Sequence, residues 1–158
     1  MAARAKFTDD EWDTLAYGPV YMLLHVGGAD ATIDVDEWSA LVKAVGEQAD
    51  HHSELVRELM AEVASDWRSG PKEWTDTWHP IDGLREVAAI LDAKAGDDAT
   101  PVKETLLELG AVVATASGSK LAAFLQNLAG KGWGGASADE REALFTAAEA
   151  LGRPRFVD

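Results

Sequence analysis

The sequence predicts an all-α fold. Apolar residues recur at spacings of three and four through most of the chain, as they do along one face of a helix. Capping motifs precede several of these periodic runs, and glycine or proline follows most of them. No segment shows the sustained alternation of apolar and polar residues that marks a half-buried strand. We therefore expect a single domain, residues 1–158, folded as a bundle of about seven helices.

The composition narrows the classes of function. The chain carries 28 acidic and 14 basic side chains, for a formal net charge of −14. A charge of this sign argues against nucleic acid and against anionic membrane surfaces as partners. The absence of cysteine excludes disulfides, thiol catalysis and thiolate metal sites. With no apolar signal segment and no run apolar enough for membrane insertion, we expect a cytoplasmic protein, either a monomer or a homodimer.

The first helix is expected to begin at a capping box formed by Thr8 and Glu11, in which each side chain binds the backbone N–H of the other residue. Its apolar face starts at Trp12, and Gly27 with Gly28 ends it. Pro19 lies inside this run, so we expect a kink there, because proline removes a backbone donor and clashes with the preceding turn.

The second helix follows a corner rich in carboxylates. Asp34 and Glu37 have the spacing of a capping box, and Ile33 and Trp38 have that of a hydrophobic staple. Asp30 lies in the Gly-Gly-Ala-Asp turn just before them. The predicted inner face of this helix consists of Trp38, Leu41, Val42 and Val45.

A third helix is expected from about His52, and a fourth from Pro80 to Gly96. The predicted inner face of the third helix consists of Leu55, Val56, Leu59, Met60, Val63 and Trp67. A longer helix should begin at Thr100, a cap candidate before a proline, and end near Ser117. Residues 109–130 are the least charged part of the chain, and we expect them to form the innermost layer.

Past Gly118 we expect a further helix that carries Phe124, and then a last helix capped by Ser137 and Glu140. The predicted inner face of the last helix consists of Leu144, Phe145, Ala148 and Leu151, and Gly152 ends it. This corner repeats the spacing of the acidic corner, with Leu144 and Phe145 in the places of Leu41 and Val42. The match indicates a weak pseudo-twofold repeat.

The two corners also carry a family resemblance. The run Ala29-Asp-Ala-Thr-Ile-Asp-Val-Asp-Glu37 resembles the Ala-Asp-Gly-x-Ile-Asp-x-x-Glu signature of the TerB-like (tellurite-resistance) helical family, and residues 134–140 resemble its second corner. The resemblance implies a non-catalytic, stress-associated domain of about seven helices in two halves. It also implies that Asp30, Asp34 and Glu37 bind a divalent cation. The chain departs from the pattern at Ala31 and at Trp133.

The chemistry of the acidic corner leaves two interpretations open. Hard cations such as Ca²⁺ or Mg²⁺ take oxygen ligands, which Asp30, Asp34 and Glu37 could supply with carbonyls of the turn. The spacing is not that of an EF-hand, because Val35 stands where the loop needs its glycine and Leu41 where it needs glutamate. Helix capping by Asp34 and Glu37 explains the same residues without a metal.

The histidines give a weaker metal signal. His51 and His52 are adjacent, and adjacent side chains on a helix point about 100° apart, so we expect two solvated rings that do not share an ion. For His25 we expect either a half-buried side chain or a partner of the acidic corner.

Two functional hypotheses follow. The first is the non-catalytic, cation-binding domain of the TerB-like type. The second is an interaction module in which tryptophan-bearing loops dock a protein partner without any metal. The tryptophans in question are Trp67, Trp74, Trp78 and Trp133. An enzyme is least favoured, since the sequence shows no Gly-x-Ser-x-Gly elbow and no identifiable general base.

Overall fold

The computed structural model describes residues 3–27, 35–66, 79–116 and 138–153, and all of the regular structure in these ranges is helical. The predicted all-α fold is therefore confirmed. The elements in chain order are η1 (Arg4–Lys6), α1 (Asp9–Ala16), α2 (Gly18–Met22), η2 (Leu23–Gly27), α3 (Val35–Gly46), η4 (Glu47–Asp50), α4 (Glu54–Asp66), α5 (Pro80–Lys94), η6 (Gly96–Asp98), α6 (Ala99–Ala116) and α8 (Ala138–Leu151). Of these, η2 is a π-helix and η1, η4 and η6 are 3-10 helices.

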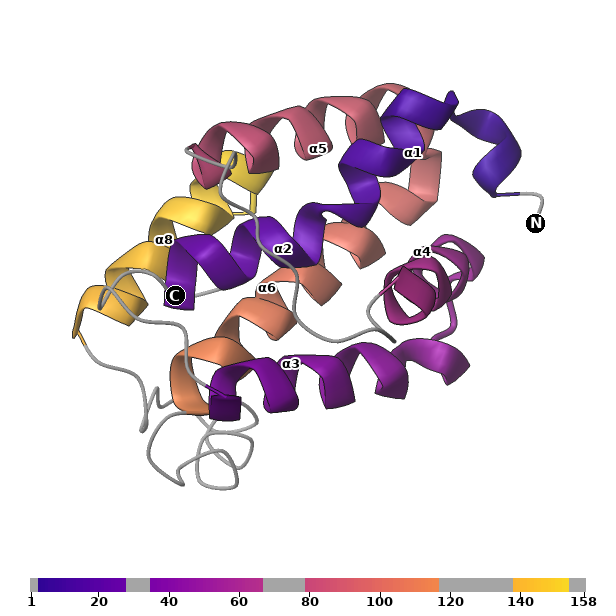
Figure 1. Cartoon of the computed structure of the whole chain (residues 1–158). Coiled ribbons are helices and arrows are strands. Elements are labelled where there is room, and N and C mark those ends of the chain that lie inside the picture. Colours follow the sequence, from indigo (N-terminus) through magenta and orange to yellow (C-terminus); the bar gives the residue numbers. More distant parts are fainter. Residues whose placement is uncertain (1–2, 28–34, 67–78, 117–137, 154–158) are drawn as a thin grey trace.

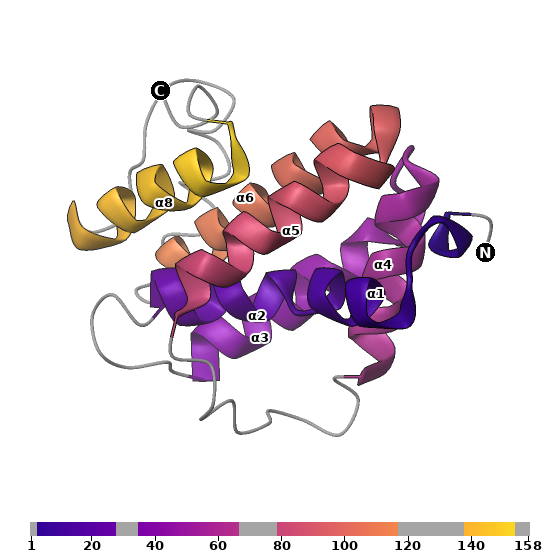
Figure 2. The same ribbon diagram turned by 90° about the horizontal axis from the view of Figure 1, so that it is seen from above.

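Helix α6 runs through the middle of the bundle, where it packs against α2, α3 and α8 (Figure 1). Helix α5 packs against α8 and α2 on one side of it (Figures 1 and 2). The buried side chains of the described helices form one hydrophobic core. Those of α6 include Val102, Leu106, Leu107, Leu109, Ala111, Val113 and Ala114. The expected innermost layer is thus confirmed for its described part, and Phe124 lies outside the described residues.

Glycines allow the central helices to approach one another closely. A β-carbon at Gly18 of α2 would lie 2.9 Å from Cδ2 of Leu106 in α6. A β-carbon at Gly110 of α6 would fall on the side chain of Met22 and 2.9 Å from Cδ2 of Leu144 in α8. A β-carbon at either position would require the ends of the facing Leu106, Met22 or Leu144 side chains to shift, so these glycines favour close packing of α2, α6 and α8.

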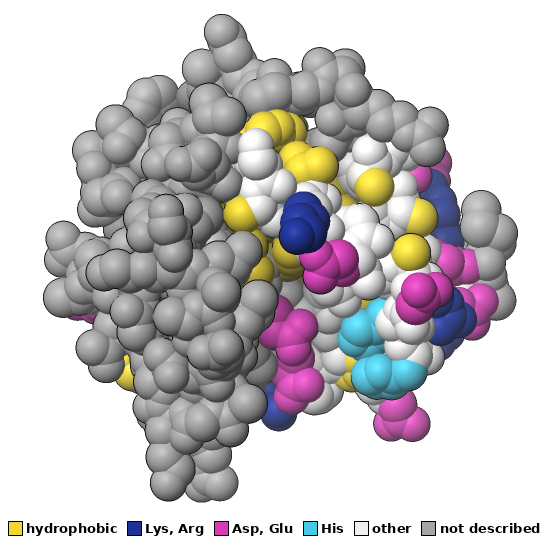
Figure 3. All heavy atoms as spheres, turned by 90° about the horizontal axis from the view of Figure 1, so that it is seen from below, with side chains coloured by type: hydrophobic (Ala, Val, Ile, Leu, Met, Phe, Trp, Pro, Cys, Tyr) yellow, Lys and Arg dark blue, Asp and Glu magenta, His cyan; other side chains and the backbone are white. Residues whose placement is uncertain are grey.

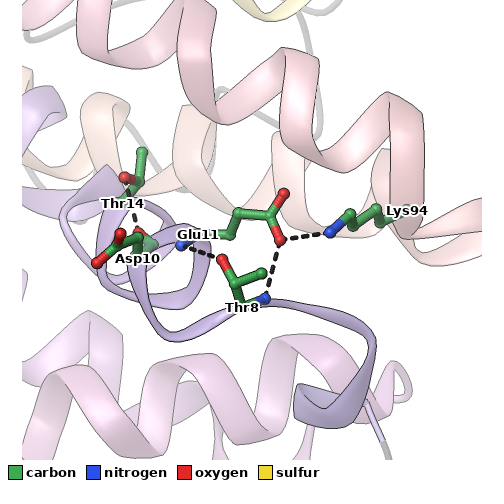
Figure 4. Close-up of polar contacts among 5 residues, drawn as sticks. All are labelled: Thr8, Asp10, Glu11, Thr14 and Lys94. Carbon is green, nitrogen blue, oxygen red and sulfur yellow. Dashed lines mark hydrogen bonds and ion pairs between the residues drawn. The ribbon is translucent and has the colours of Figure 1, made fainter.

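The capping box at the start of α1 is confirmed. The Thr8 N–H donates to Glu11 Oε1 at 2.8 Å, and the Glu11 N–H donates to Thr8 Oγ1 at 3.1 Å (Figure 4). Lys94 of α5 donates to the same Glu11 oxygen at 2.5 Å, which ties α1 to α5. The Lys94 hydrogen bond, followed by the one from Thr8, lowers the pKa of Glu11. One carboxylate therefore caps a helix and joins two helices.

The helix that was expected to run through Pro19 is instead divided. Helix α1 ends at Ala16, and α2 begins at Gly18 with Pro19 in its first turn. Proline fits there because the first turn of a helix has no intrahelical partner for its backbone N–H groups. Pro19 thus starts a helix rather than kinking one.

Two predicted core positions are wrong. Val42 of α3 and Phe145 of α8 are each 39% exposed, whereas Leu41 and Leu144 beside them are buried. A step of one residue turns a helix by about 100°, which carries the second side chain out of a narrow buried face. Leu41 matches Leu144 in burial and Val42 matches Phe145 in exposure, while the pseudo-twofold repeat itself stays a prediction.

Apart from the division before Pro19, the predicted helix boundaries that fall on described residues hold except at two N-termini. Gly96 and Gly152 end α5 and α8 with φ values of 57° and 77°, the left-handed conformation that glycine adopts without strain. Thr100 does not cap α6, because the helix begins at Ala99 directly after η6. Helix α4 begins at Glu54, two residues after His52.

Several predictions fall on residues outside the described ranges. These are the cap at Ser137, the break at Gly118 and the placement of Trp67, Trp74, Trp78 and Trp133. Among the described residues, no helix is both long and apolar enough to cross a membrane.

Candidate functional site

The predicted metal corner lies mostly beyond the described residues. Helix α3 spans Val35–Gly46, so Glu37 falls in its first turn. Asp30, Asp34 and the side chain of Glu37 are outside the described residues. In the part of the chain that the structure describes, no group of three or more histidine, cysteine or acidic side chains could hold a metal ion. Cation binding at the acidic corner stays a prediction.

His25 is half-buried, which is one of the two outcomes expected for it. Its Nε2 lies 2.9 Å from the carbonyl oxygen of Ala143, so the ring nitrogen donates and ties η2 to α8. Burial lowers the pKa of His25, because an imidazolium loses solvation in this position, while the Ala143 carbonyl partly offsets that effect.

His51 and His52 precede α4 rather than lying on it, so the helical geometry assumed for them was wrong. Their rings stack with centroids 4.2 Å apart and planes inclined by 26°. Histidine side chains lie beside acidic ones on the face of the molecule drawn in Figure 3. Burial, followed by the charges of His52 and Arg57, lowers the pKa of His51. The lowered pKa favours the neutral His51 ring, whose Nδ1 accepts the backbone N–H of Ser53.

Ser53, His51 and Asp98 come together, but not in the order that a nucleophile needs. A catalytic triad requires the serine hydroxyl to donate to a histidine nitrogen that a carboxylate orients. Here Ser53 Oγ donates directly to Asp98 Oδ1 at 2.9 Å and accepts the Val56 N–H at 3.3 Å. His51 Nδ1 accepts the backbone N–H of Ser53 at 2.9 Å. The group therefore caps α4 and joins it to η6.

A cavity of about 430 Å³ opens where the N-terminal segment meets α4. We call it the N-terminal cavity. It is lined by Arg4, Trp12, Ala49, Arg57, Glu58, Ala61 and Glu62, which come from η1, α1, η4 and α4. Its volume falls in the range of sites that take small molecules.

Both arginines of the N-terminal cavity are held in place by neighbouring residues. The Arg4 guanidinium lies 5.1 Å from the ring centroid of Trp12, and its Nη2 lies 2.7 Å from Asp9 Oδ1. Arg57 Nη1 donates to the carbonyl oxygen of His51 at 2.6 Å. A guanidinium has five N–H donors, so each arginine keeps donors for a further partner.

The other side chains of the lining divide into an apolar wall and an acidic rim. Trp12 is only 2% exposed, and its indole N–H has no hydrogen-bond partner among the described residues. Glu58 accepts the backbone N–H of Arg4 at 3.1 Å, which fixes η1 against α4. Glu62 and Ala61 are exposed. The cavity thus offers an aromatic wall, guanidinium donors and carboxylates within one small space.

Comparisons of the chain with protein-family models, with curated proteins and with solved structures give no match.

Sequence reasoning missed the N-terminal cavity. Trp12 was expected only as the start of an inner helical face, and neither Arg4 nor Arg57 belongs to any motif. The lining combines residues more than fifty positions apart, so no local pattern could indicate that they meet.

Proposed function

We propose that the chain is a non-catalytic binding domain that acts in the cytoplasm and recognises another molecule at the N-terminal cavity. The observation that carries the proposal is the cavity itself, with the buried ring of Trp12 and the tethered guanidinium groups of Arg4 and Arg57 in its lining. Binding sites commonly combine an apolar wall with a few polar groups of fixed position, and this lining does so.

A fragment screen with a cavity-filling variant tests this proposal. The intact chain is screened by ligand-observed NMR against a library of small anionic, neutral and cationic organic molecules. Ala61→Phe places a ring in the lining and should abolish binding of the fragments that the parent binds. Ala89→Phe, at an exposed position of α5, is the matched control and should keep them. Binding that survives Ala61→Phe, or a screen with no binder, would contradict the proposal.

The acidic corner supports a second candidate function, in which a TerB-like domain binds Ca²⁺ or Mg²⁺ through Asp30, Asp34 and Glu37. The supporting observation is that α3 spans Val35–Gly46, so Glu37 lies in the first turn of this helix. Carboxylates at the start of a helix interact favourably with the helix dipole, and they are also ligands that a hard cation prefers.

Calorimetric melting of chelator-treated protein distinguishes cation binding at the corner from helix capping alone. If the corner binds a cation, Ca²⁺ or Mg²⁺ should raise the melting temperature, since a ligand stabilises the state that binds it. The double variant Asp34→Ser with Glu37→Gln keeps good capping residues but loses the charges, so it should keep its metal-free stability and lose the rise. A parent protein that shows no rise with any common divalent cation would rule out the site.

A further inference from the structure

The charges around the N-terminal cavity indicate which molecules would fit it. We propose that the cavity binds a small organic monocarboxylate with a flat apolar body. This inference rests on the proposed binding function and adds a ligand class to it. The anionic head would meet Arg57 and Arg4, and the apolar body would lie along Trp12 and Ala61.

Arg57 is the main anchor for the anionic head. The ion pairs found among the described residues include Arg4 with Asp9 but none of Arg57. Arg57 donates a hydrogen bond to the His51 carbonyl, an uncharged acceptor that tethers the guanidinium without neutralising it. A carboxylate could take two of the remaining N–H donors side by side, the geometry that guanidinium groups favour.

The acidic side chains limit the ligand to one negative charge. Glu58 and Glu62 belong to the same lining as the two arginines, so the formal charges of the lining cancel. A phosphate or a dicarboxylate would bring a second negative charge close to these glutamates, and like charges at short range repel. A cationic head would have to enter beside two guanidinium groups. A single carboxylate satisfies the open donors with the least repulsion.

The apolar part of the lining accounts for the flat body. The methyl groups of Ala49 and Ala61 line the cavity together with the small exposed part of the Trp12 ring, which is 2% exposed, and an aromatic edge favours contact with planar groups. The Trp12 indole N–H adds a donor that has no partner in the described part of the chain. Because this atom is shut off from solvent, a ligand would reach it only after the lining side chains move apart.

Three probes that share an indole ring test the ligand class. Indole-3-acetate is anionic, indole-3-acetamide is neutral and tryptamine is cationic. Each is titrated into the intact chain, and the dissociation constant is taken from ligand-observed NMR. We expect indole-3-acetate to bind at least about tenfold more tightly than the other two, as a charge-assisted hydrogen bond warrants.

Matched variants test the anchor. Arg57→Gln should weaken indole-3-acetate binding by about tenfold or more, because it removes the charge and the paired donors. Arg85→Gln removes the same charge from an exposed arginine of α5 and should change the constant by less than about twofold. If Arg57→Gln fails to fold by circular dichroism, Arg57→Lys replaces it, and it should also weaken binding because lysine lacks the fork of donors.

The outcomes separate the ligand class from the binding function. Tighter binding of tryptamine or of the amide overturns the monocarboxylate proposal, and the fragment screen with Ala61→Phe still decides the proposed function. No binding by any of the three probes also overturns the ligand class. Equal binding of indole-3-acetate by the parent and a folded Arg57 variant overturns the anchor. A failed fragment screen is the separate result that refutes the binding function.

Discussion

The centre of the bundle and the N-terminal cavity are built in opposite ways. Between α2, α6 and α8, a β-carbon at Gly18 or Gly110 would meet side chains of the facing helices and require them to shift. Between the N-terminal segment and α4, about 430 Å³ is left unfilled. The centre contains little except apolar side chains, whereas charged groups form much of the cavity lining. The comparison indicates that close packing in the centre holds the fold and leaves the lining available for recognition.

A buried lysine of α6 and a half-buried arginine of the cavity lining also have different kinds of partner. Lys103 of α6 is 6% exposed, and its ammonium group lies 2.7 Å from Asp92 Oδ1. A buried charge of this kind needs a partner, because desolvation without one is costly. Arg57 in the cavity is half-buried and tethered by a backbone carbonyl. Lys103 is therefore neutralised by a carboxylate within the fold, whereas Arg57 binds an uncharged carbonyl and keeps its charge for a ligand.

The largest effect should come from making a cavity in the centre. Leu106 is fully buried and packs on Gly18, so Leu106→Ala removes contacts that the close helices cannot restore. We expect the free energy of unfolding to fall by about 2–5 kcal/mol, measured by denaturant titration. Val42→Ala, at a 39% exposed position of α3, is the control and should cost less than about 1 kcal/mol. Equal effects at the two sites would refute the contrast in packing.

A matched pair of substitutions that add bulk sharpens the comparison. Ala111 in α6 is fully buried, and Ala61 in α4 is an exposed residue of the cavity lining. We expect Ala111→Leu to destabilise the protein by about 1–3 kcal/mol through overpacking. Ala61→Leu should change stability by no more than about 0.5 kcal/mol, because the added methyl groups enter open space. Thermal unfolding of both variants measures the difference, and a large loss for Ala61→Leu would mean that the cavity is filled.

The helices and their buried faces could be predicted from the sequence because helical periodicity and capping are local properties. The Thr8–Glu11 box, the buried stripe of α4 and the stops at Gly96 and Gly152 all follow from residues within a few turns of one another. The errors at Val42 and Phe145 arise because periodicity indicates an apolar stripe but not how wide the buried part of it is. That width depends on which helix packs against the stripe.

The cavity could not be predicted, since it depends on where separate helices meet. Arg4, Trp12 and Arg57 come from three elements, and each has an ordinary local environment in the sequence. The role of Ser53 was missed for a similar reason. Its cap of α4 is strengthened by Asp98 of η6, forty-five positions later, and the residue three positions after Ser53 is Val56 rather than the glutamate of a capping box.

A smaller effect is expected at the junction beside the cavity. Ser53→Ala removes the hydroxyl that accepts the Val56 N–H and binds Asp98. Loss of such a helix cap should cost about 0.5–2 kcal/mol in the free energy of unfolding. Ser39→Ala, at an exposed position inside α3, is the matched control and should be nearly neutral. A Ser53 variant as stable as the Ser39 variant would show that other contacts hold the start of α4.

The smallest expected effect is on the pH dependence of stability, and it can be compared between the two regions. His25, between η2 and α8, and His51, beside the N-terminal cavity, both have pKa values lowered first by burial. Above the ordinary histidine pKa of about 6.5, both rings are neutral in the folded and unfolded states, so their protonation does not change the free energy of unfolding. As the pH falls below that value, the unfolded chain takes up protons first, so stability is lost until the folded rings are protonated too.

His25→Gln should therefore make the decline in stability below neutral pH shallower, as measured by denaturant titrations at a series of pH values. His79→Gln, at an exposed position before α5, is the control and should leave the profile unchanged. The part of the decline due to His25 should persist at high salt, because desolvation is not screened by ions. The part due to His51 should shrink, since the charges of His52 and Arg57 also contribute to its pKa. A His25 contribution that disappears in salt would show that charges, rather than burial, set its pKa.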